Sequence, residues 1–228
     1  MEENTVPRLE LNPILPSMPV FGEKTQVDIR YVVLAPYVSA HIHWDLPKRE
    51  VVYDLEEPIL NDTEKDVLRA IKQEITPIMG FDFIMGKTLP DLLDYIDKAA
   101  KMTLIGSGLD LNISSYEKVF YYLYRDFIGM NEIEGLMRDP FLREIVCSGT
   151  NSPLTTIHSV YGNMQTNVLY KEAELLAVFV RKLAQRFGGE ANDSSPFNEG
   201  TLPDGSRVNL YYTTKSTSKG STFNIKKR

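Results

Sequence analysis

The sequence has little cysteine and no long hydrophobic run. Its one cysteine, Cys147, excludes an internal disulfide, and its apolar neighbours predict a buried thiol in a reducing compartment. No run approaches the roughly 18 apolar residues of a membrane-spanning helix. The N-terminus, MEENTVPRLE, has acidic residues where a secretory signal has basic ones. We therefore expect neither secretion nor insertion into a membrane.

Basic residues are outnumbered, and they are unevenly distributed. The 228 residues have a net charge of −6, and residues 205–228 hold six basic residues and no acidic one. This end therefore carries +6, which leaves −12 on residues 1–204. A basic end attracts the phosphates of a nucleotide, nucleic acid or lipid, or an acidic protein surface. A merely solvated strand and loop is the alternative.

Hydropathy patterns divide the chain into three parts. Residues 1–25 contain four prolines among isolated aliphatic residues, which predicts an extended arm. Residues 26–129 begin with three alternating segments, typical of an antiparallel β-meander, and continue with helical periodicity. Residues 130–228 alternate between strand and helix patterns. We expect an α+β fold, with a meander and helical subdomain followed by a small mixed sheet with helices.

Capping patterns place the helices. Asn61 with Glu64 predicts the start of the first helix, and Pro90 precedes the second. The run Ser114-Ser-Tyr-Glu117 predicts a capping box at the start of an aromatic-rich helix that ends at Gly129. Further along, apolar residues at helical spacing predict a helix over 176–187, and the last strands are expected over 208–212 and 222–226.

Two local patterns suggest chemistry that their surroundings do not support. Gly86-Lys87-Thr88 is similar to the end of a phosphate-binding loop, but the required preceding glycine and strand are missing. His41 and His43 share a strand face with Asp45 and suggest zinc, but no third strong ligand is identifiable. We interpret the pair as the polar face of a half-covered sheet and expect no metal site. No residue stands out as a nucleophile.

The most specific string is TLPDGSRVN, residues 201–209. Its Pro203-Asp-Gly205 segment predicts a turn that starts a strand and fixes the direction of Arg207. Arg207, Asn209 and Tyr211 then share one face of that strand. By itself this pattern is typical of a structural hairpin.

Together with other strings, this one resembles a known family. TLPDGSRVN, NEIEGLMRDPFLREIVCSG and KGSTFNIKK resemble the N-terminal domain of the hexameric secretion ATPases, the motors of type II and type IV secretion, type IV pili and the archaellum. APYVSAHI and REVVYDLEEPIL resemble the archaeal branch, and the archaellum motor ATPase is the nearest match. The resemblance covers most of residues 26–228 and leaves out the arm.

The resemblance implies that catalysis belongs to another part of the motor. In this family a RecA-like domain follows a strand such as STFNIKK and holds the phosphate-binding loop, the acidic boxes and the histidine box, none of which occurs here. We therefore expect this chain, as part of a longer protein or as an isolated regulatory module, not to hydrolyse ATP alone. ATP and Mg²⁺ belong to the complete motor, and no cofactor is expected for this chain by itself.

Three arginines are the nucleotide-contacting candidates that the resemblance implies. Arg207 matches the arginine of the family motif and is the main candidate for an arginine finger that reaches the γ-phosphate in a closed ring. Many relatives have a second arginine where this sequence has Thr201, so Arg181 or Arg186 on the preceding helix has to substitute. A solvated helix face is the alternative for those two.

The resemblance also implies partners and a place in the cell. These are the RecA-like domain of the same or a neighbouring subunit, a homo-hexamer, a membrane platform protein and, in the archaellum, a RecA-like accessory ATPase. Such a protein is cytoplasmic and lies at the membrane periphery, and the arm and the helical section are the expected docking places. The alternatives are a stand-alone sensor or adaptor and a nucleic-acid-binding module. The last predicts exposed aromatics between the lysines, for which Tyr211 and Phe223 are candidates. The charge of −12 on residues 1–204 argues against it, and we expect no nucleic-acid partner.

Overall fold

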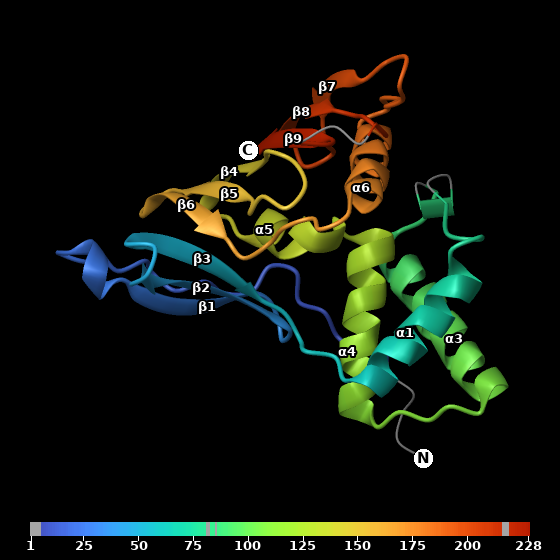
Figure 1. Cartoon of the computed structure of the whole chain (residues 1–228). Coiled ribbons are helices and arrows are strands. Elements are labelled where there is room, and N and C mark those ends of the chain that lie inside the picture. The colour runs from blue at the N-terminus through green and yellow to red at the C-terminus, as the bar shows by residue number, and fades with distance from the viewer. Residues whose placement is uncertain (1–5, 81–82, 85, 216–218) are drawn as a thin grey trace.

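The computed structural model describes residues 6–80, 83–84, 86–215 and 219–228, and its architecture is α+β as expected. The described strands form a nine-stranded mixed sheet in the order β1-β2-β3-β6-β5-β4-β9-β8-β7. Figure 1 shows α1, α3 and α4 gathered to one side of the sheet, with α5 and α6 nearer to it. The strands are β1 (Asp28–Leu34), β2 (Val38–Asp45), β3 (Glu50–Glu56), β4 (Leu142–Cys147), β5 (Thr155–His158), β6 (Gly162–Thr166), β7 (Phe197–Thr201), β8 (Arg207–Tyr211) and β9 (Thr222–Lys226).

The predicted meander is confirmed. Strands β1, β2 and β3 pair antiparallel, with Ile42 opposite Ile29 on one side and Tyr53 on the other. Their alternating apolar residues are buried on one face, and His41 and His43 lie on the other. β3 then pairs in parallel with β6, which joins the meander to the strands of the second half. The predicted division near Gly129 therefore falls within a protein that has one continuous sheet.

The junction between the two halves of the sheet is reinforced by hydrogen bonds of Asn167, which is exposed, and of Asp139, which is buried. Asn167 accepts a hydrogen bond from the backbone N–H of Leu55 (2.9 Å) and donates one to its carbonyl (3.0 Å). The hydroxyls of Tyr31 and Tyr53 donate to Asp139 Oδ2 at 2.6 and 2.9 Å. Asp139 belongs to the NEIEGLMRDPFLR string, so part of that string holds the meander against the second half.

The helices between the two halves of the sheet have a core of their own. They are α1 (Asp62–Ile75), α3 (Leu89–Ser107), α4 (Ile113–Leu123) and the π-helical turn η2 (Tyr124–Ile128). The predicted stripe of α1, which includes Val67 and Ile71, packs against Ile96 of α3 and Phe120 of α4. Asn61 and Glu64 form the predicted capping box.

One predicted cap is wrong. The N-cap of α4 is Asn112, whose side chain accepts from Ser115 N at 2.9 Å, so the helix begins before the Ser114–Glu117 run. A side-chain oxygen caps a helix only if it faces the free N–H groups of the first turn, and Ser114 already lies within that turn. The chain does leave the helical conformation at Gly129, as predicted.

In the second half, α6 (Ala173–Gln185) covers one face of the sheet. Its buried stripe, which includes Leu176 and Leu183, belongs to the same core as Phe223 and Ile225 of β9. The short helical segments η3 (Asn131–Ile133) and α5 (Glu134–Arg138) precede β4. Strand β7 was not predicted, because its sequence FNEGT has too little hydrophobicity to show a strand pattern.

The N-terminal arm is extended from residue 6 to residue 23 and lies against its own chain. Leu9, Leu11 and Leu15 are partly buried against the main core, whereas Glu10, Asn12 and Ile14 between them are exposed. Glu10 pairs with Ala35, next to β1, through two backbone hydrogen bonds of 3.0 Å. Tyr161 donates to the carbonyl of Pro19 at 2.7 Å. The helix η1 (Lys24–Gln26) then leads into β1.

Among the described residues, no helix combines the length and the apolar character that crossing a membrane requires.

Candidate functional site

Arg207 lies at the start of β8, directly after a tight turn. Gly205 has a φ of +89°, a conformation that glycine adopts without strain. Ser206 donates from its backbone to Asp204 Oδ1 (2.9 Å), and Leu202 N donates to Ser206 O (2.8 Å), which closes the turn. The side chain of Arg207 is exposed, and no ion pair joins it to a carboxylate within the described part of the chain. The predicted turn therefore presents a free guanidinium on a fixed strand.

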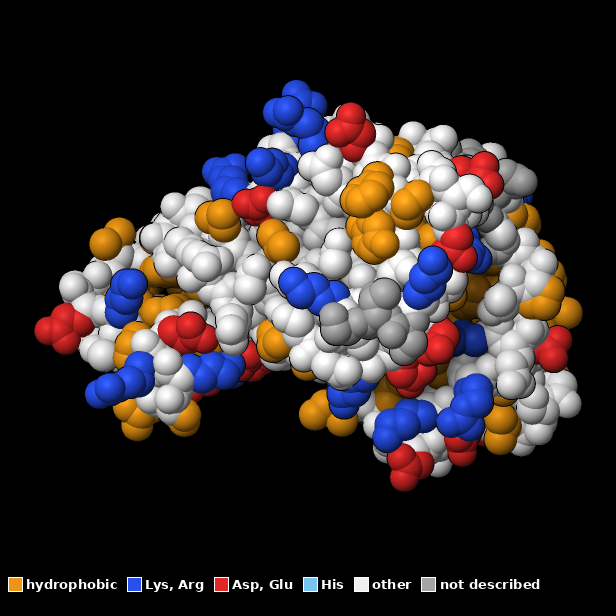
Figure 2. Space-filling view, turned by 45° about the horizontal axis from the view of Figure 1, so that its top comes forward, with side chains coloured by type: hydrophobic (Ala, Val, Ile, Leu, Met, Phe, Trp, Pro, Cys, Tyr) orange, Lys and Arg blue, Asp and Glu red, His pale blue; other side chains and the backbone are white. Residues whose placement is uncertain are grey.

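The sheet face opposite α6 is open over β4, β9, β8 and β7, and we call it the open face. Cross-strand pairing arranges its outward residues in three parallel rows. The basic row contains Glu144, Lys226, Arg207 and Thr201; the amide row contains Val146, Asn224, Asn209 and Glu199; the aromatic row contains Thr222, Tyr211 and Phe197. Figure 2 shows Lys and Arg side chains gathered at one margin of the molecule and a hydrophobic group beside them.

A groove of about 460 Å³ lies at the aromatic end of the open face. It is lined by the amide row residues Asn209 and Asn224, by the aromatic pair Phe197 and Tyr211, and by Lys219. Phe197 is 77% exposed, and its ring centroid lies 4.8 Å from that of Tyr211. Phe223, which was predicted with Tyr211 as an exposed aromatic, is buried against α6 instead, because neighbouring residues of a strand point to opposite faces.

Not all of the basic end contributes to this surface. Lys227 points inward and donates to the carbonyls of Leu136 (2.9 Å) and Asp139 (2.5 Å). Burial lowers the pKa of Lys227 to about 8. The other five basic residues, Arg207, Lys215, Lys219, Lys226 and Arg228, are exposed.

The two arginines of α6 have partners within the chain. Arg181 lies over the ring of Tyr212, with 5.1 Å from its guanidinium carbon to the ring centroid, and donates to the hydroxyl of that tyrosine. Arg186 donates to the carbonyls of Ile128 (2.9 Å) and Gly129, where η2 ends. Burial lowers the pKa of Arg186. The structure thus places the three candidate arginines in three different settings, and only Arg207 has no such partner among the described residues.

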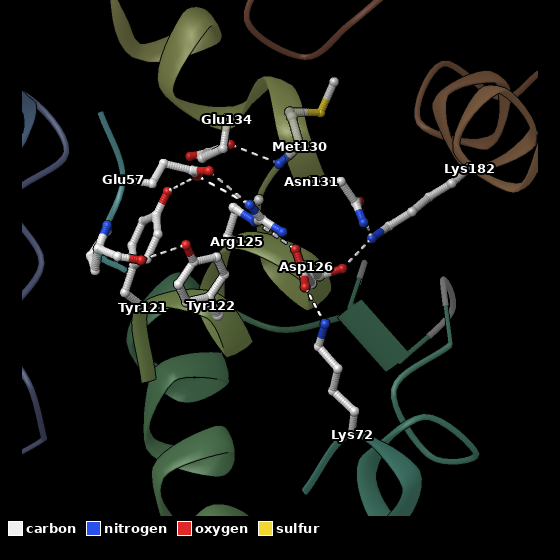
Figure 3. Close-up of polar contacts among 12 residues, drawn as sticks. Glu57, Lys72, Tyr121, Tyr122, Arg125, Asp126, Met130, Asn131, Glu134 and Lys182 are labelled. Atoms are coloured by element: carbon white, nitrogen blue, oxygen red, sulfur yellow. Dashed lines mark hydrogen bonds and ion pairs between the residues drawn. The ribbon is translucent and has the colours of Figure 1, made fainter. Parts of the chain in front are cut away.

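Arg186 lies beside a half-buried charge cluster that the sequence patterns did not reveal. We call this the η2 cluster; it consists of Glu57, Lys72, Tyr121, Arg125, Asp126 and Lys182. Arg125 binds Glu57 Oε2 at 3.0 Å and Asp126 Oδ1 at 2.7 Å. Figure 3 shows Lys72 approaching Asp126 from α1 and Lys182 approaching it from α6.

The electrostatics of the η2 cluster follow from burial and pairing. Burial acts to raise the pKa of Asp126, but Arg125 and Lys72 outweigh it and hold that pKa below its ordinary value. Lys182 donates to the carbonyl of Asp126 (2.5 Å) and to Asn131 Oδ1 (2.9 Å). Burial, with the nearby charge of Arg186, lowers the pKa of Lys182 to about 8. The cluster ties α1, η2 and α6 together; the Arg125-Asp126 pair inside an aromatic helix was its only sign in the sequence.

The patterns that suggested a metal site or a phosphate-binding loop have structural roles, and so does the lone cysteine. His41 Nε2 lies 2.8 Å from Asp28 and His43 Nε2 lies 3.0 Å from Asp54, and the two rings stack with centroids 4.4 Å apart. No group of three or more His, Cys, Asp or Glu side chains in the described residues is placed to hold a metal ion. Burial raises the pKa of Cys147 to about 11, as befits an inert thiol. Thr88 caps α3.

Comparison with known proteins finds uncharacterized archaeal relatives. No protein-family model matches the chain. The uncharacterized protein MJ0900 of Methanocaldococcus jannaschii is 37% identical over 111 residues, which are 49% of this chain and 20% of that protein. The uncharacterized protein MJ1288 of the same organism is 29% identical over 169 residues, 74% of this chain and 67% of that protein. The chain thus spans only a fifth of the first relative.

Among solved structures, the chain is similar to the VirB11 ATPase of the Brucella suis type IV secretion system, which was crystallised with sulphate. The sequence identity is 17% and the TM-score is 0.36, over 43% of this chain and 30% of that one.

Proposed function

We propose that the chain is the non-catalytic N-terminal domain of a hexameric secretion-type motor ATPase of the archaellum branch. In this proposal it closes over ATP bound by a RecA-like domain. It passes the resulting motion to membrane-platform partners and so couples hydrolysis to archaellum assembly or rotation. The proposal rests on the family strings around residues 131–149, 201–209 and 219–227 and on one structural observation, the free guanidinium of Arg207.

The setting of Arg207 suits a group that acts on a phosphate held by another domain. Charge spreads over the γ-phosphate oxygens during phosphoryl transfer, and a fixed cation stabilises that charge. Arg207 meets this need because its strand is paired on both sides, with Thr201 of β7 and Lys226 of β9. An arginine sealed against a carboxylate could not serve in this way.

The proposal assigns lesser roles to the other two arginines. Arg186 already satisfies the carbonyls at the end of η2, and Arg181 stacks on Tyr212. For either to replace the second finger at Thr201, it has to leave these partners when the ring closes. We therefore propose Arg207 as the principal finger and Arg186 as a residue that positions α6.

The first test is ATP turnover by the chain alone and with a RecA-like half added in trans. We expect no hydrolysis by the chain, since the described site supplies a cation but no phosphate cradle. We expect hydrolysis when the RecA-like half is supplied. Steady hydrolysis by the purified chain contradicts the proposal.

The second test is Arg207→Ala in the assembly that hydrolyses ATP. Arginine fingers contribute about 10³-fold or more to kcat, so we expect kcat to fall by at least about 100-fold while the KM for ATP changes little. Arg69→Ala is the matched control, because Arg69 is an exposed arginine on α1 that pairs only with Asp66 among the described residues. An Arg207→Ala variant with the kcat of the control excludes the finger role.

A further inference from the structure

The open face offers more than the cation of Arg207. We propose that the groove at its aromatic end is a nucleobase subsite, which takes the base of a nucleoside phosphate whose phosphates lie toward the basic row. The inference rests on the proposed function for the role of Arg207 and adds the part of the ligand that this arginine does not reach.

The aromatic row supplies a surface on which a base stacks. Phe197 lies on β7, the last strand of the sheet, and keeps 77% of its surface exposed although it touches Tyr211. The two rings are inclined by 47°, so they do not cover each other's faces. Exposed aromatic rings on a sheet are the usual platform for bases, because every base has a flat π-face.

The amide row supplies hydrogen-bonding groups beside that surface. Asn209 and Asn224 are cross-strand neighbours, and both line the groove. Asn224 donates through Nδ2 to Glu144 (2.8 Å), while its Oδ1 is buried without a hydrogen-bond partner in the described structure. An unpaired buried acceptor is costly unless a donor reaches it, and the N–H groups of a base edge are such donors. Glu199, next to Asn209, is a further acceptor for an exocyclic amino group.

The dimensions suit a nucleoside phosphate. Arg207 and Tyr211 are four residues apart on β8, which separates the basic row from the aromatic row by about 13 Å. An extended nucleoside triphosphate spans such a distance from its γ-phosphate to its base. The groove volume of about 460 Å³ lies within the range of small-molecule sites. Lys219, which also lines the groove, adds positive charge at the aromatic end itself.

This inference changes one expectation drawn from the sequence. The resemblance implied no nucleotide for the chain by itself, whereas a base subsite with a basic margin gives the chain alone a weak affinity for ATP. Most of the binding energy for the phosphates still belongs to the RecA-like part.

Isothermal titration calorimetry of the chain with ATP, tripolyphosphate and adenosine tests the subsite. In titrations at millimolar ligand concentration, we expect the chain to bind ATP more tightly than tripolyphosphate. Phe197→Ala and Tyr211→Ala should each weaken ATP binding about tenfold, the effect of removing one base stack, and leave tripolyphosphate binding unchanged. Phe197→Leu keeps an apolar side chain without a stacking face and should behave like Phe197→Ala. Ile105→Ala, at an exposed residue of α3, is the control.

The outcomes separate this inference from the proposed function. If ATP binds no better than tripolyphosphate, or if Phe197→Ala binds ATP like Ile105→Ala, the base subsite is wrong, while the turnover test of Arg207 stands by itself. If Phe197→Ala weakens ATP binding but Arg207→Ala leaves ATP binding and turnover unchanged, the subsite is supported and the finger is excluded.

A ten-nucleotide single strand is the last ligand to be titrated against the chain. Tighter binding of that strand than of ATP would overturn the assignment to a mononucleotide.

Discussion

At the scale of single residues, burial decides which charges are available for function. The chain has many lysines and arginines, but the structure turns Lys182, Arg186 and Lys227 inward, where they bind backbone carbonyls. Arg207 differs because exposed and buried residues alternate along β8. Its side chain points into solvent, whereas that of the next residue, Val208, is buried. A basic residue in this sequence is thus a functional candidate only after its side chain has been placed.

The depressed pKa of Lys182 predicts how stability depends on pH. Its pKa falls from 10.5 to about 8 on folding, so between these values the unfolded chain binds more protons than the folded one. The free energy of unfolding therefore rises with pH in this window, by about 1 to 2 kcal/mol between about pH 8 and 9.5 for this lysine. Below about pH 8 the lysine is charged in both states, and this gain is absent.

Urea denaturation of Lys182→Met at the two pH values measures that contribution. We expect the rise in unfolding free energy from pH 8 to 9.5 to be smaller in Lys182→Met than in wild type. Lys65→Met removes an exposed lysine of α1 and should keep the wild-type rise. All other titrating groups are shared, so the difference between the two variants reports Lys182. Equal slopes in both variants would refute the assigned pKa.

At the scale of elements, the start of α4 shows how two capping patterns compete. Ser114 begins a capping-box sequence, but Asn112 lies two residues earlier and binds the N–H of Ser115. We expect Asn112→Ala to lower the free energy of unfolding by about 1 kcal/mol, because it leaves a first-turn N–H without its acceptor.

Ser114→Ala is the matched control for this cap. Ser114 is exposed inside the first turn, so its replacement should change the free energy of unfolding by less than about 0.5 kcal/mol. Urea denaturation of both variants gives the two values. If Ser114→Ala costs more than Asn112→Ala, the helix begins where the sequence pattern placed it, and the observed start is wrong.

At the scale of the whole molecule, the two halves of the sheet share one core. Ala40 and Ile42 of the meander belong to the same buried cluster as Leu183 of α6 and Ile225 of β9. Asp139 adds buried hydrogen bonds across the junction, and Asn167 adds partly buried ones. We therefore expect the chain to unfold in a single cooperative transition, although its sequence suggests a boundary near Gly129.

Two probes of one urea titration test this expectation. Trp44, the chain's one tryptophan, lies on β2 and reports the meander by fluorescence, whereas far-UV circular dichroism reports the helices and both halves of the sheet. We expect the two transitions to coincide. A fluorescence midpoint that differs from the circular dichroism midpoint shows that the meander folds as a separate unit. The predicted boundary is then a domain boundary.

The sequence by itself determined the local elements of this protein. The meander, the stripes of α1 and α6, the turn before Arg207 and the burial of Cys147 could all be predicted, because each depends on the spacing of residues close together in the chain. It also contained the strings that suggested the function. Strand β7 and the Asn112 cap were missed, since the local pattern was weak in one case and ambiguous in the other.

Only the tertiary structure decided which distant residues meet. The parallel pairing of β3 with β6, the η2 cluster and the three rows of the open face each join segments from different parts of the chain. No local pattern encodes such contacts, because they depend on the spatial order of the strands in the sheet and on which face of the sheet α6 covers. For the same reason Phe197 appeared in no prediction, although it now carries the proposed base subsite.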